Sequence, residues 1–210
     1  MVMGRRDLGE EDSQNVLKKM IKSVGRHGRD LLLLAGVGPR LREDDRRVLE
    51  GIIFPYVVVQ PDLQRVLLVG CHWYTWHYEK LLAGTDVSTI EIDPTRKRYG
   101  AKRHIVESVE FVDRHFAPGS LDVVMLCGVI GWGLDDPEVA DRSIAAIFEV
   151  LRPGGVFVIS ISDVPAHLSF PVQKLGALGR FTPWVFPPLK AQHHLCTGEL
   201  RDTFYFYRRP

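Results

Sequence analysis

Two features of the sequence could together hold a nucleoside, and they lie 21 residues apart. The apolar run at residues 66–69 ends at Gly70, and a second apolar run ends at the acidic residue Glu91. In a β-α-β unit the first strand brings its backbone to the ligand, and a carboxylate after the second strand accepts hydrogen bonds from ribose hydroxyls. This spacing predicts a site for an adenosine-type cofactor.

A cluster of histidine and aromatic residues follows the first strand. Residues 71–78 read Cys-His-Trp-Tyr-Thr-Trp-His-Tyr. His72 and Tyr74 lie in the predicted loop itself, which makes them candidates for ligand contacts at the mouth of the site. Trp76 and Tyr78 come later, and we expect them to pack a helix against the sheet.

A framework of alternating strands and helices is predicted from residue 65 onward to position these groups. The apolar runs predict strands at residues 65–69, 87–92, 104–109, 121–127 and 156–161. A helix is predicted at residues 75–83, and another begins after Asp136, because Asp136 can cap free amides and Pro137 suits the first turn. Strands joined by helical crossovers indicate a parallel sheet with helices on both faces.

The two ends of the chain depart from this alternation. Residues 1–60 are predicted to form an N-terminal helical extension whose exit Pro55 and Pro61 mark, with the charged run 41–50 as a solvated helix face. Residues 164–190 contain five prolines, which excludes one long helix and favours a lid over the site. The aromatic segment 202–207 is predicted to be a strand that closes the sheet edge.

The composition is that of a globular protein without a polyanion partner. The chain has 210 residues, of which 27 are basic and 26 acidic, so its net charge of +1 gives no field that favours nucleic acid. The spacing of its histidines and three cysteines matches no metal site, and Cys71 has no basic partner nearby in the sequence, which favours packing over a nucleophilic role. We expect no metal and a reduced, cytoplasmic setting.

Membrane and export signals are not expected either. The first 14 residues lack the apolar core of a signal peptide, and the apolar run 31–35 is too short to span a membrane. The sequence leaves the oligomeric state open.

Taken in order, the landmarks resemble the class I S-adenosylmethionine-dependent methyltransferase superfamily over roughly residues 60–210. The landmarks are the strand ending at Gly70, the acid Glu91, the segment 121–133, and the turn at residues 151–155, which reads Leu-Arg-Pro-Gly-Gly. The resemblance implies a Rossmann-like three-layer α/β sandwich at residues 61–210. Its mostly parallel seven-stranded sheet would carry a C-terminal antiparallel strand and follow the N-terminal helical extension at residues 1–60.

The resemblance also implies a cofactor, S-adenosyl-L-methionine, and residues to hold it. The backbone after the first strand would approach the methionine part, while the carboxylates of Glu91 and Glu107 would meet the ribose and the adenine. The residues expected at the cofactor are Gly70, Cys71, His72, Glu91, Ile92, Glu107, Cys127 and Gly128.

The implied function is methyl transfer to a small-molecule acceptor. Superfamily members often hold the acceptor near the loop after the fourth strand, so Trp132 is expected to bind substrate together with Tyr74. Asp135, His72 and His167 are candidates for removing a proton from the acceptor. The near-neutral charge favours a small molecule over nucleic acid.

The loop after the first strand departs from the superfamily pattern. Leu68 stands where an acidic residue is usual, and His72 and Tyr74 stand where two further glycines are usual. Either the loop is reshaped and still binds the cofactor, or binding has been lost. The alternatives to methyl transfer are therefore another chemistry on the same fold and a non-catalytic binding or scaffold protein.

Overall fold

The computed structural model describes residues 43–162, 170–198 and 201–210, together with residues 28, 38, 40, 41 and 164. The chain divides into two compact units, Met1–Pro39 and Arg40–Pro210, and the described fold belongs almost entirely to the second. Most of the helical extension predicted before residue 40 lies outside the described residues.

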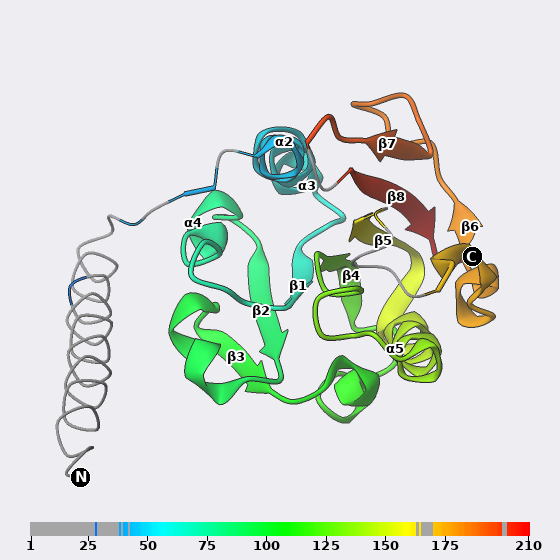
Figure 1. Ribbon diagram of the computed structural model, residues 1–210, viewed down its shortest axis with the longest axis horizontal. Coiled ribbons are helices and arrows are strands. Elements are labelled where there is room, and N and C mark those ends of the chain that lie inside the picture. Colours follow the sequence, from blue (N-terminus) through cyan, green and yellow to red (C-terminus); the bar gives the residue numbers. More distant parts are fainter. Residues whose placement is uncertain are drawn as a thin grey trace, which may run out of the picture. The chain divides into compact units, whose positions relative to one another are not determined.

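A single sheet of eight strands among the described residues forms the centre of the second unit (Figure 1). Its order is β3-β2-β1-β4-β5-β8-β6, and β7 pairs with β8 off this path. Five strands run parallel to one another: β1 (Arg65–Val69), β2 (Asp86–Glu91), β3 (Arg103–Val106), β4 (Leu121–Cys127) and β5 (Leu151–Ser162). Three pair antiparallel: β6 (Thr182–Pro183), β7 (His193–Leu195) and β8 (Asp202–Arg208). The expected mostly parallel sheet is confirmed, with eight strands rather than seven.

Helical segments connect these strands. The longest is α5 (Pro137–Val150), and the carboxylate of Asp136 caps it by accepting hydrogen bonds from the amides of Glu138 and Val139, as predicted. The predicted helix at 75–83 is shorter, α4 (Tyr78–Leu81). The remaining connections contain short stretches of 3₁₀-helix: η2 (Pro94–Tyr99), η3 (Val109–Arg114), η4 (Val172–Lys174) and η5 (Ala177–Arg180).

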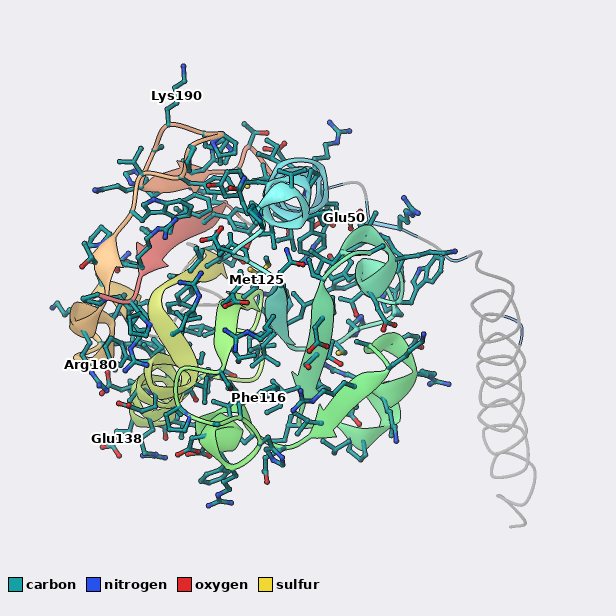
Figure 2. All side chains as sticks on the ribbon, turned by 180° about the vertical axis from the view of Figure 1, so that it is seen from behind. Glu50, Phe116, Met125, Glu138, Arg180 and Lys190 are labelled. Carbon is teal, nitrogen blue, oxygen red and sulfur yellow. The ribbon has the colours of Figure 1, made fainter. Side chains whose placement is uncertain are left out.

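Alternate residues of the central strands point to opposite layers, as a strand's period of two requires. In β4, Val124 and Leu126 pack into the cluster that contains α5. Val123 and Met125 pack into the other cluster, which the N-terminal helix covers. Figure 1 shows α5 and that helix on opposite sides of the strands, and Figure 2 places Met125 in the interior and Lys190 at the periphery. The core is therefore a three-layer sandwich.

The N-terminal helix is continuous through three segments, α2 (Asp44–Val48), η1 (Leu49–Ile53) and α3 (Phe54–Val59). The middle segment is a widened π-turn in which the amide of Phe54 donates to the carbonyl of Leu49. Pro55 explains it, because proline has no amide hydrogen and its ring would clash with the carbonyl of Gly51 in an ordinary α-turn. The helix therefore runs past Pro55 and ends at Val59, before Pro61 and near the predicted residue 60.

Two residues of this helix correct the expectation of a solvated face at residues 41–50. Asp45 and Arg46 are only 6% and 8% exposed. The prediction of solvent exposure is wrong for both, because they face the sheet and not the solvent side of the helix.

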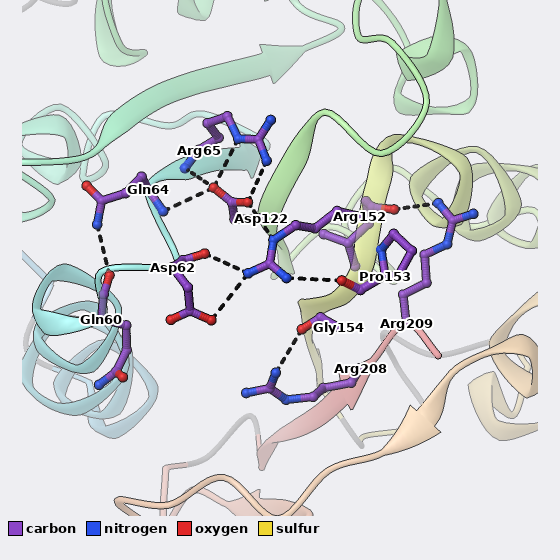
Figure 3. A network of polar contacts seen from close by, with 11 residues as sticks. Gln60, Asp62, Gln64, Arg65, Asp122, Arg152, Pro153, Gly154, Arg208 and Arg209 are labelled. Atoms are coloured by element: carbon purple, nitrogen blue, oxygen red, sulfur yellow. Dashed lines mark hydrogen bonds and ion pairs between the residues drawn. The ribbon is translucent and has the colours of Figure 1, made fainter.

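A polar network at the amino ends of the strands fastens β1, β4 and β5 together (Figure 3). The buried carboxylate of Asp122 accepts hydrogen bonds from the amides of Gln64 and Arg65 at 3.1 and 2.8 Å. It also accepts from the guanidiniums of Arg65 and Arg152, at 2.7 and 2.8 Å. Burial alone would raise the pKa of Asp122, but these donors outweigh it and lower the pKa to about 2.

Candidate functional site

A cavity of about 530 Å³ lies at the carboxyl ends of β1, β2 and β4. In open α/β sheets the crevice outside these ends is where ligands bind. The loop after β1, the ends of β2 and β4 and the helix segment α2 all contribute to its walls. The site therefore lies at the edge of the sheet formed by the carboxyl ends of its parallel strands, opposite the Asp122 network.

Gly70 begins the loop after β1 in a conformation that favours glycine. Its φ of +85° lies in the left-handed region, and a side chain there would begin 3.0 Å from Cγ2 of Val129. The amide of Gly70 donates to the carbonyl of Ile90 at 2.9 Å, which continues the pairing of β1 with β2. The backbone at Gly70 is thus held at the cavity wall with no side chain between it and a ligand.

The carboxylate of Glu91 is buried beside this loop and is only 6% exposed. One oxygen accepts the amide of Cys71 at 2.8 Å, and the other accepts the amide of Asp93 at 2.9 Å. The guanidinium of Arg96 lies 3.7 Å away, beyond hydrogen-bond distance. Because each carboxylate oxygen can accept two hydrogen bonds, Glu91 keeps acceptor capacity for a ligand that enters the cavity.

The β1 loop is held by a threonine where the superfamily pattern has further glycines. The hydroxyl of Thr75 accepts the amide of His72 at 3.1 Å and lies 2.9 Å from the carbonyl of the same residue. The imidazole of His72 lies against the ring of Tyr74, with ring centroids 5.1 Å apart, and both side chains line the cavity. The loop is therefore reshaped around side chains.

Arg46 is a cavity residue that the sequence analysis missed. Its Nη1 donates to the hydroxyl of Tyr78 at 3.1 Å, its Nε lies 2.9 Å from a carboxylate oxygen of Asp45, and its guanidinium covers the ring of Tyr74. Burial opposes its charge, but Tyr78 and Asp45 favour the charged form and raise the pKa of Arg46 above its ordinary value. Helical spacing could have found it, since Arg46 lies three residues before the buried Leu49.

The end of β4 closes the cavity floor. Gly128 has a φ of +65°, and its amide donates to the hydroxyl of Ser160 on β5 at 3.1 Å.

Burial raises the pKa of both Cys71 and Cys127 to about 12. Both thiols are therefore neutral near pH 7, which argues against a nucleophilic role for either.

Comparison with known proteins agrees with this geometry. Residues 69–159 match the family model described as "Methyltransferase domain". That stretch begins at the end of β1 and ends within β5, so it contains the loop at Gly70, the carboxylate of Glu91 and the end of β4. Over this stretch the chain matches a methyltransferase domain.

Solved structures with the same fold include several methyltransferases. The N-methyltransferase NodS from Bradyrhizobium japonicum, in complex with S-adenosylhomocysteine, is 17% identical, with a TM-score of 0.59 over 80% of this chain and 89% of that one. The 1,6-didemethyltoxoflavin-N1-methyltransferase from Burkholderia thailandensis is 16% identical, with a TM-score of 0.55 over 100% and 92%. Magnesium protoporphyrin IX methyltransferase from Synechocystis is 12% identical, with a TM-score of 0.57 over 79% and 80%. At these identities the likeness shows the fold. No curated protein matches the sequence.

The methyltransferase domain brings most of the predicted site residues together. The predicted residues that line the cavity are Gly70, Cys71, His72, Tyr74, Glu91, Ile92, Glu107, Cys127, Gly128 and Trp132. Ile92 and Trp132 stand at the rim, with 69% and 50% of their surfaces exposed. Their roles in binding stay predictions.

One predicted catalytic residue does not join this group, and another is not described by the structure. Asp135 does not line the cavity; one of its carboxylate oxygens lies 3.5 Å from the amide of Gly133, on the exposed loop after β4. His167, in the predicted lid, lies outside the described residues. Of the three candidates for proton removal, His72 is at the cavity wall.

The described part of the predicted lid packs elsewhere. In residues 170–190, the amide of Ala177 donates to Asp141 of α5 at 2.8 Å, and the ring of Phe181 lies 5.0 Å from that of Phe148. None of residues 170–190 lines the cavity. A lid over the site stays a prediction for residues 165–169, which the structure does not describe.

Two other kinds of site are absent from the described residues. No group of three histidine, cysteine or carboxylate side chains there could hold a metal ion. No helix there has the length and apolar character needed to cross a membrane.

Proposed function

We propose that this protein transfers a methyl group from S-adenosylmethionine to a small-molecule acceptor. The observation that carries the proposal is the carboxylate of Glu91. It is buried at the end of β2, fixed by the amides of Cys71 and Asp93, and faces a cavity within the matched methyltransferase domain. This is the arrangement that a pair of ribose hydroxyls requires from an acceptor group.

The residues present fit the cofactor. Glu91 would accept from the ribose hydroxyls, the bare backbone of Gly70 would lie along the methionine part, and Glu107 would meet the adenine amine. The exposed side chain of Ile92 gives an apolar surface beside the purine. When bound, the cofactor supplies a methyl group that its sulfonium has already activated.

The charge of the cavity also supports a cationic ligand. Two guanidiniums and six carboxylates line it, the carboxylates being those of Glu43, Asp45, Glu91, Asp93, Glu107 and Asp202. Each guanidinium has a carboxylate within 4 Å, Arg46 with Asp45 and Arg96 with Asp93. A wall with this excess of negative charge favours a sulfonium and disfavours a phosphorylated acceptor.

The chain's own contribution to the reaction is then mainly orientation. A rigid loop and strand ends hold the two reactants in line and exclude water, which is where most of the rate enhancement for an activated methyl group arises. His72, at the cavity wall, would take a proton from a hydroxyl or amine acceptor. The neutral thiols of Cys71 and Cys127 would not compete for the methyl group.

Calorimetry with S-adenosylmethionine and S-adenosylhomocysteine tests cofactor binding. We expect micromolar affinity for the wild-type chain and a loss of at least tenfold in Glu91→Gln, because the amide replaces one acceptor oxygen by a donor. Glu110→Gln is the matched control, since Glu110 pairs with Arg142 outside the cavity. No binding of either compound at millimolar concentration would contradict the proposal and favour a scaffold protein.

A transfer assay tests the reaction itself. The chain is incubated with methyl-labelled cofactor and the low-molecular-weight fraction of a cell extract, and the label is expected in a small product only when active protein is present. Binding without transfer would favour another chemistry on the same fold. Label that appears only in protein or nucleic acid when whole extract is used would contradict the small-molecule acceptor.

A further inference from the structure

The carboxylate of Asp45 is buried without a hydrogen-bond donor. Its side chain is only 8% exposed, and it forms an ion pair with Arg46, whose Nε lies 2.9 Å away. This contact lacks the geometry of a hydrogen bond, since Nε of Arg46 has no hydrogen-bond partner. Within the described part of the chain, no other group donates to this carboxylate. Buried carboxylates are normally hydrogen-bonded, so Asp45 indicates a missing donor.

This carboxylate lies at the wall of the ligand cavity. Asp45 lines the cavity, as does Leu49, which lies one helical turn later on the same face of the helix. Glu43, just before α2, lines it as well and is exposed. The missing donor therefore belongs to a molecule in the cavity.

A second buried carboxylate, that of Asp202, lines the cavity beside α2. Asp202 is the first residue of β8 and is 8% exposed. Two contacts hold α2 against this point of the sheet (Figure 1). The carboxylate of Asp44 accepts from the amide and the hydroxyl of Thr197, both at 2.8 Å, and the amide of Cys196 donates to the carbonyl of Asp202 at 2.8 Å. The fold thus brings the two buried carboxylates to one side of the cavity.

The charge on this side of the cavity is negative. Burial raises the pKa of the Cys196 thiol to about 12, and the negative charges of Asp45 and Asp202 both act in the same direction, so both lie within electrostatic range of that thiol. Together with Glu43, α2 and the start of β8 contribute three carboxylates to the cavity but only one guanidinium, that of Arg46. Such a wall favours a cation.

These carboxylates lie far from the one proposed to hold the ribose. Glu91 ends β2, and the sheet order places β1, β4 and β5 between β2 and β8. Because neighbouring strands are about 4.8 Å apart, β8 lies roughly 19 Å from β2. The apolar side chains of Leu49, Phe54 and Met125 also line the cavity. A nucleoside at Glu91 therefore leaves room for a second molecule, one with a cationic end and an apolar body.

We propose that the methyl acceptor carries a protonated amine on an apolar body, and that Asp45 and Asp202 bind this amine. The proposal rests on the proposed function of the cavity. An ammonium group supplies both the N–H donors that Asp45 lacks and the charge that the wall favours. An alcohol supplies a donor without the charge, and a carboxylate supplies neither.

Pairs of amines and alcohols with the same carbon skeleton test this recognition. The pairs are phenethylamine with 2-phenylethanol, hexylamine with 1-hexanol, and tryptamine with tryptophol. Each compound is titrated by calorimetry onto protein saturated with S-adenosylhomocysteine. We expect at least one amine to bind about tenfold more tightly than its alcohol, because its hydrogen bonds to the carboxylates are charge-assisted.

Two variants assign the preference to its residues. Asp45→Asn and Asp202→Asn each remove one charge and should each reduce the preference for the amine severalfold. Asp62→Asn is the matched control, since it removes the same charge from an exposed side chain at the opposite end of the sheet, and should leave the preference within twofold. Thermal unfolding checks each protein, and Asp202→Asn decides alone if Asp45→Asn does not fold.

The remaining outcomes separate this proposal from the proposed function. It is overturned if no amine binds more tightly than its alcohol, or if the preference survives in both variants. It is also overturned if Asp45→Asn loses affinity for S-adenosylhomocysteine and not for the amine, because Asp45 would then bind the amino group of the cofactor. If wild-type protein does not bind S-adenosylhomocysteine, the proposed function fails, and the same titrations on the free protein still decide whether these carboxylates form an amine site.

Discussion

Two buried carboxylates lie at opposite ends of the same sheet, and their surroundings differ. Asp122, at the amino end of β4, is 4% exposed and accepts hydrogen bonds from two amides and two guanidiniums (Figure 3). Glu91, at the carboxyl end of β2, is 6% exposed but accepts from two amides only, and its nearest cation is 3.7 Å away. The two carboxylates are almost equally buried, but Asp122 accepts hydrogen bonds from more protein donors than Glu91 does.

This difference separates a structural carboxylate from a binding one. The oxygens of Asp122 are surrounded by donors from β1, from β5 and from Gln64 just before β1, so nothing remains for a ligand and the group stabilises the fold. Glu91 is fixed by two amides but faces a cavity, so its remaining lone pairs can serve a ligand. Removing each carboxylate should therefore change a different property.

The largest expected effect is the loss of stability in Asp122→Asn. The substitution leaves the guanidiniums of Arg65 and Arg152 without their shared anion. Because these side chains are 45% and 26% exposed, solvent screens part of the effect, and the expected cost is about 2 kcal/mol. Urea unfolding measures the change. The control is Asp62→Asn, because the side chain of Asp62 is 59% exposed and its ion pair with Arg152 should contribute less than about 1 kcal/mol. Equal effects of the two variants would contradict the central role of Asp122.

Acid sensitivity is the next effect and has the same origin. The pKa of Asp122 is lowered from 3.8 to about 2, so its contribution is present above pH 4 and is lost as the pH falls towards 2. The linked loss in the free energy of unfolding is about 2 kcal/mol. Urea midpoints measured between pH 5 and pH 2 should fall more steeply for wild-type protein than for Asp122→Asn. If the urea midpoints of the two proteins fall in parallel, Asp122 is not the cause of the acid sensitivity.

Glu91→Gln should give the reverse pattern, with a modest effect on stability and a larger one on binding. One of the two amides loses its acceptor, which costs about 1 kcal/mol of folding free energy. The affinity for S-adenosylhomocysteine should fall at least tenfold, which calorimetry measures. If Glu91→Gln unfolds more readily than Asp122→Asn but binds S-adenosylhomocysteine normally, the assignment of Glu91 to binding and of Asp122 to stability is wrong.

The smallest effect concerns the glycine beside Glu91. Gly70→Ala places a side chain at a φ of +85° and 3.0 Å from Val129, and should cost about 1 kcal/mol of stability and several-fold in affinity. Gly84→Ala is the matched control, since Gly84 has a φ of +103° with no atom within 4 Å of the added carbon. Both variants should lose stability, and only Gly70→Ala should lose affinity for S-adenosylhomocysteine.

The central framework could be read from the sequence because its signals are local. The buried runs of β1 and β4 fall at the predicted residues, and the Asp136–Pro137 start of α5 is also as predicted. The start of β5 at Leu151, five residues before the predicted one, could not be read locally, because Arg152, Pro153 and two glycines resemble a turn. Pairing of Leu151 with Leu121 of β4 sets the boundary instead.

The cavity residues that the sheet contributes could be predicted from the sequence, whereas Arg46, which the N-terminal helix contributes, was not predicted. Residues that follow strands in sequence, such as Gly70 and Glu91, must meet at one edge of a parallel sheet. Arg46 lies in a charged run whose composition is typical of an exposed helix, and only the packing of Leu49 and Phe54 turns it inward. Its spacing from Leu49 is the one local signal, so tertiary contacts, more than composition, decided which charges of the run became part of the site.

A crystal structure with S-adenosylhomocysteine tests the central claim most directly. The account predicts the nucleoside in the cavity at the carboxyl ends of β1, β2 and β4, with its ribose hydroxyls within hydrogen-bond distance of the Glu91 carboxylate. A ligand whose ribose lies away from Glu91, or a cavity that stays filled by the side chains of His72 and Tyr74 at saturating ligand, would contradict it.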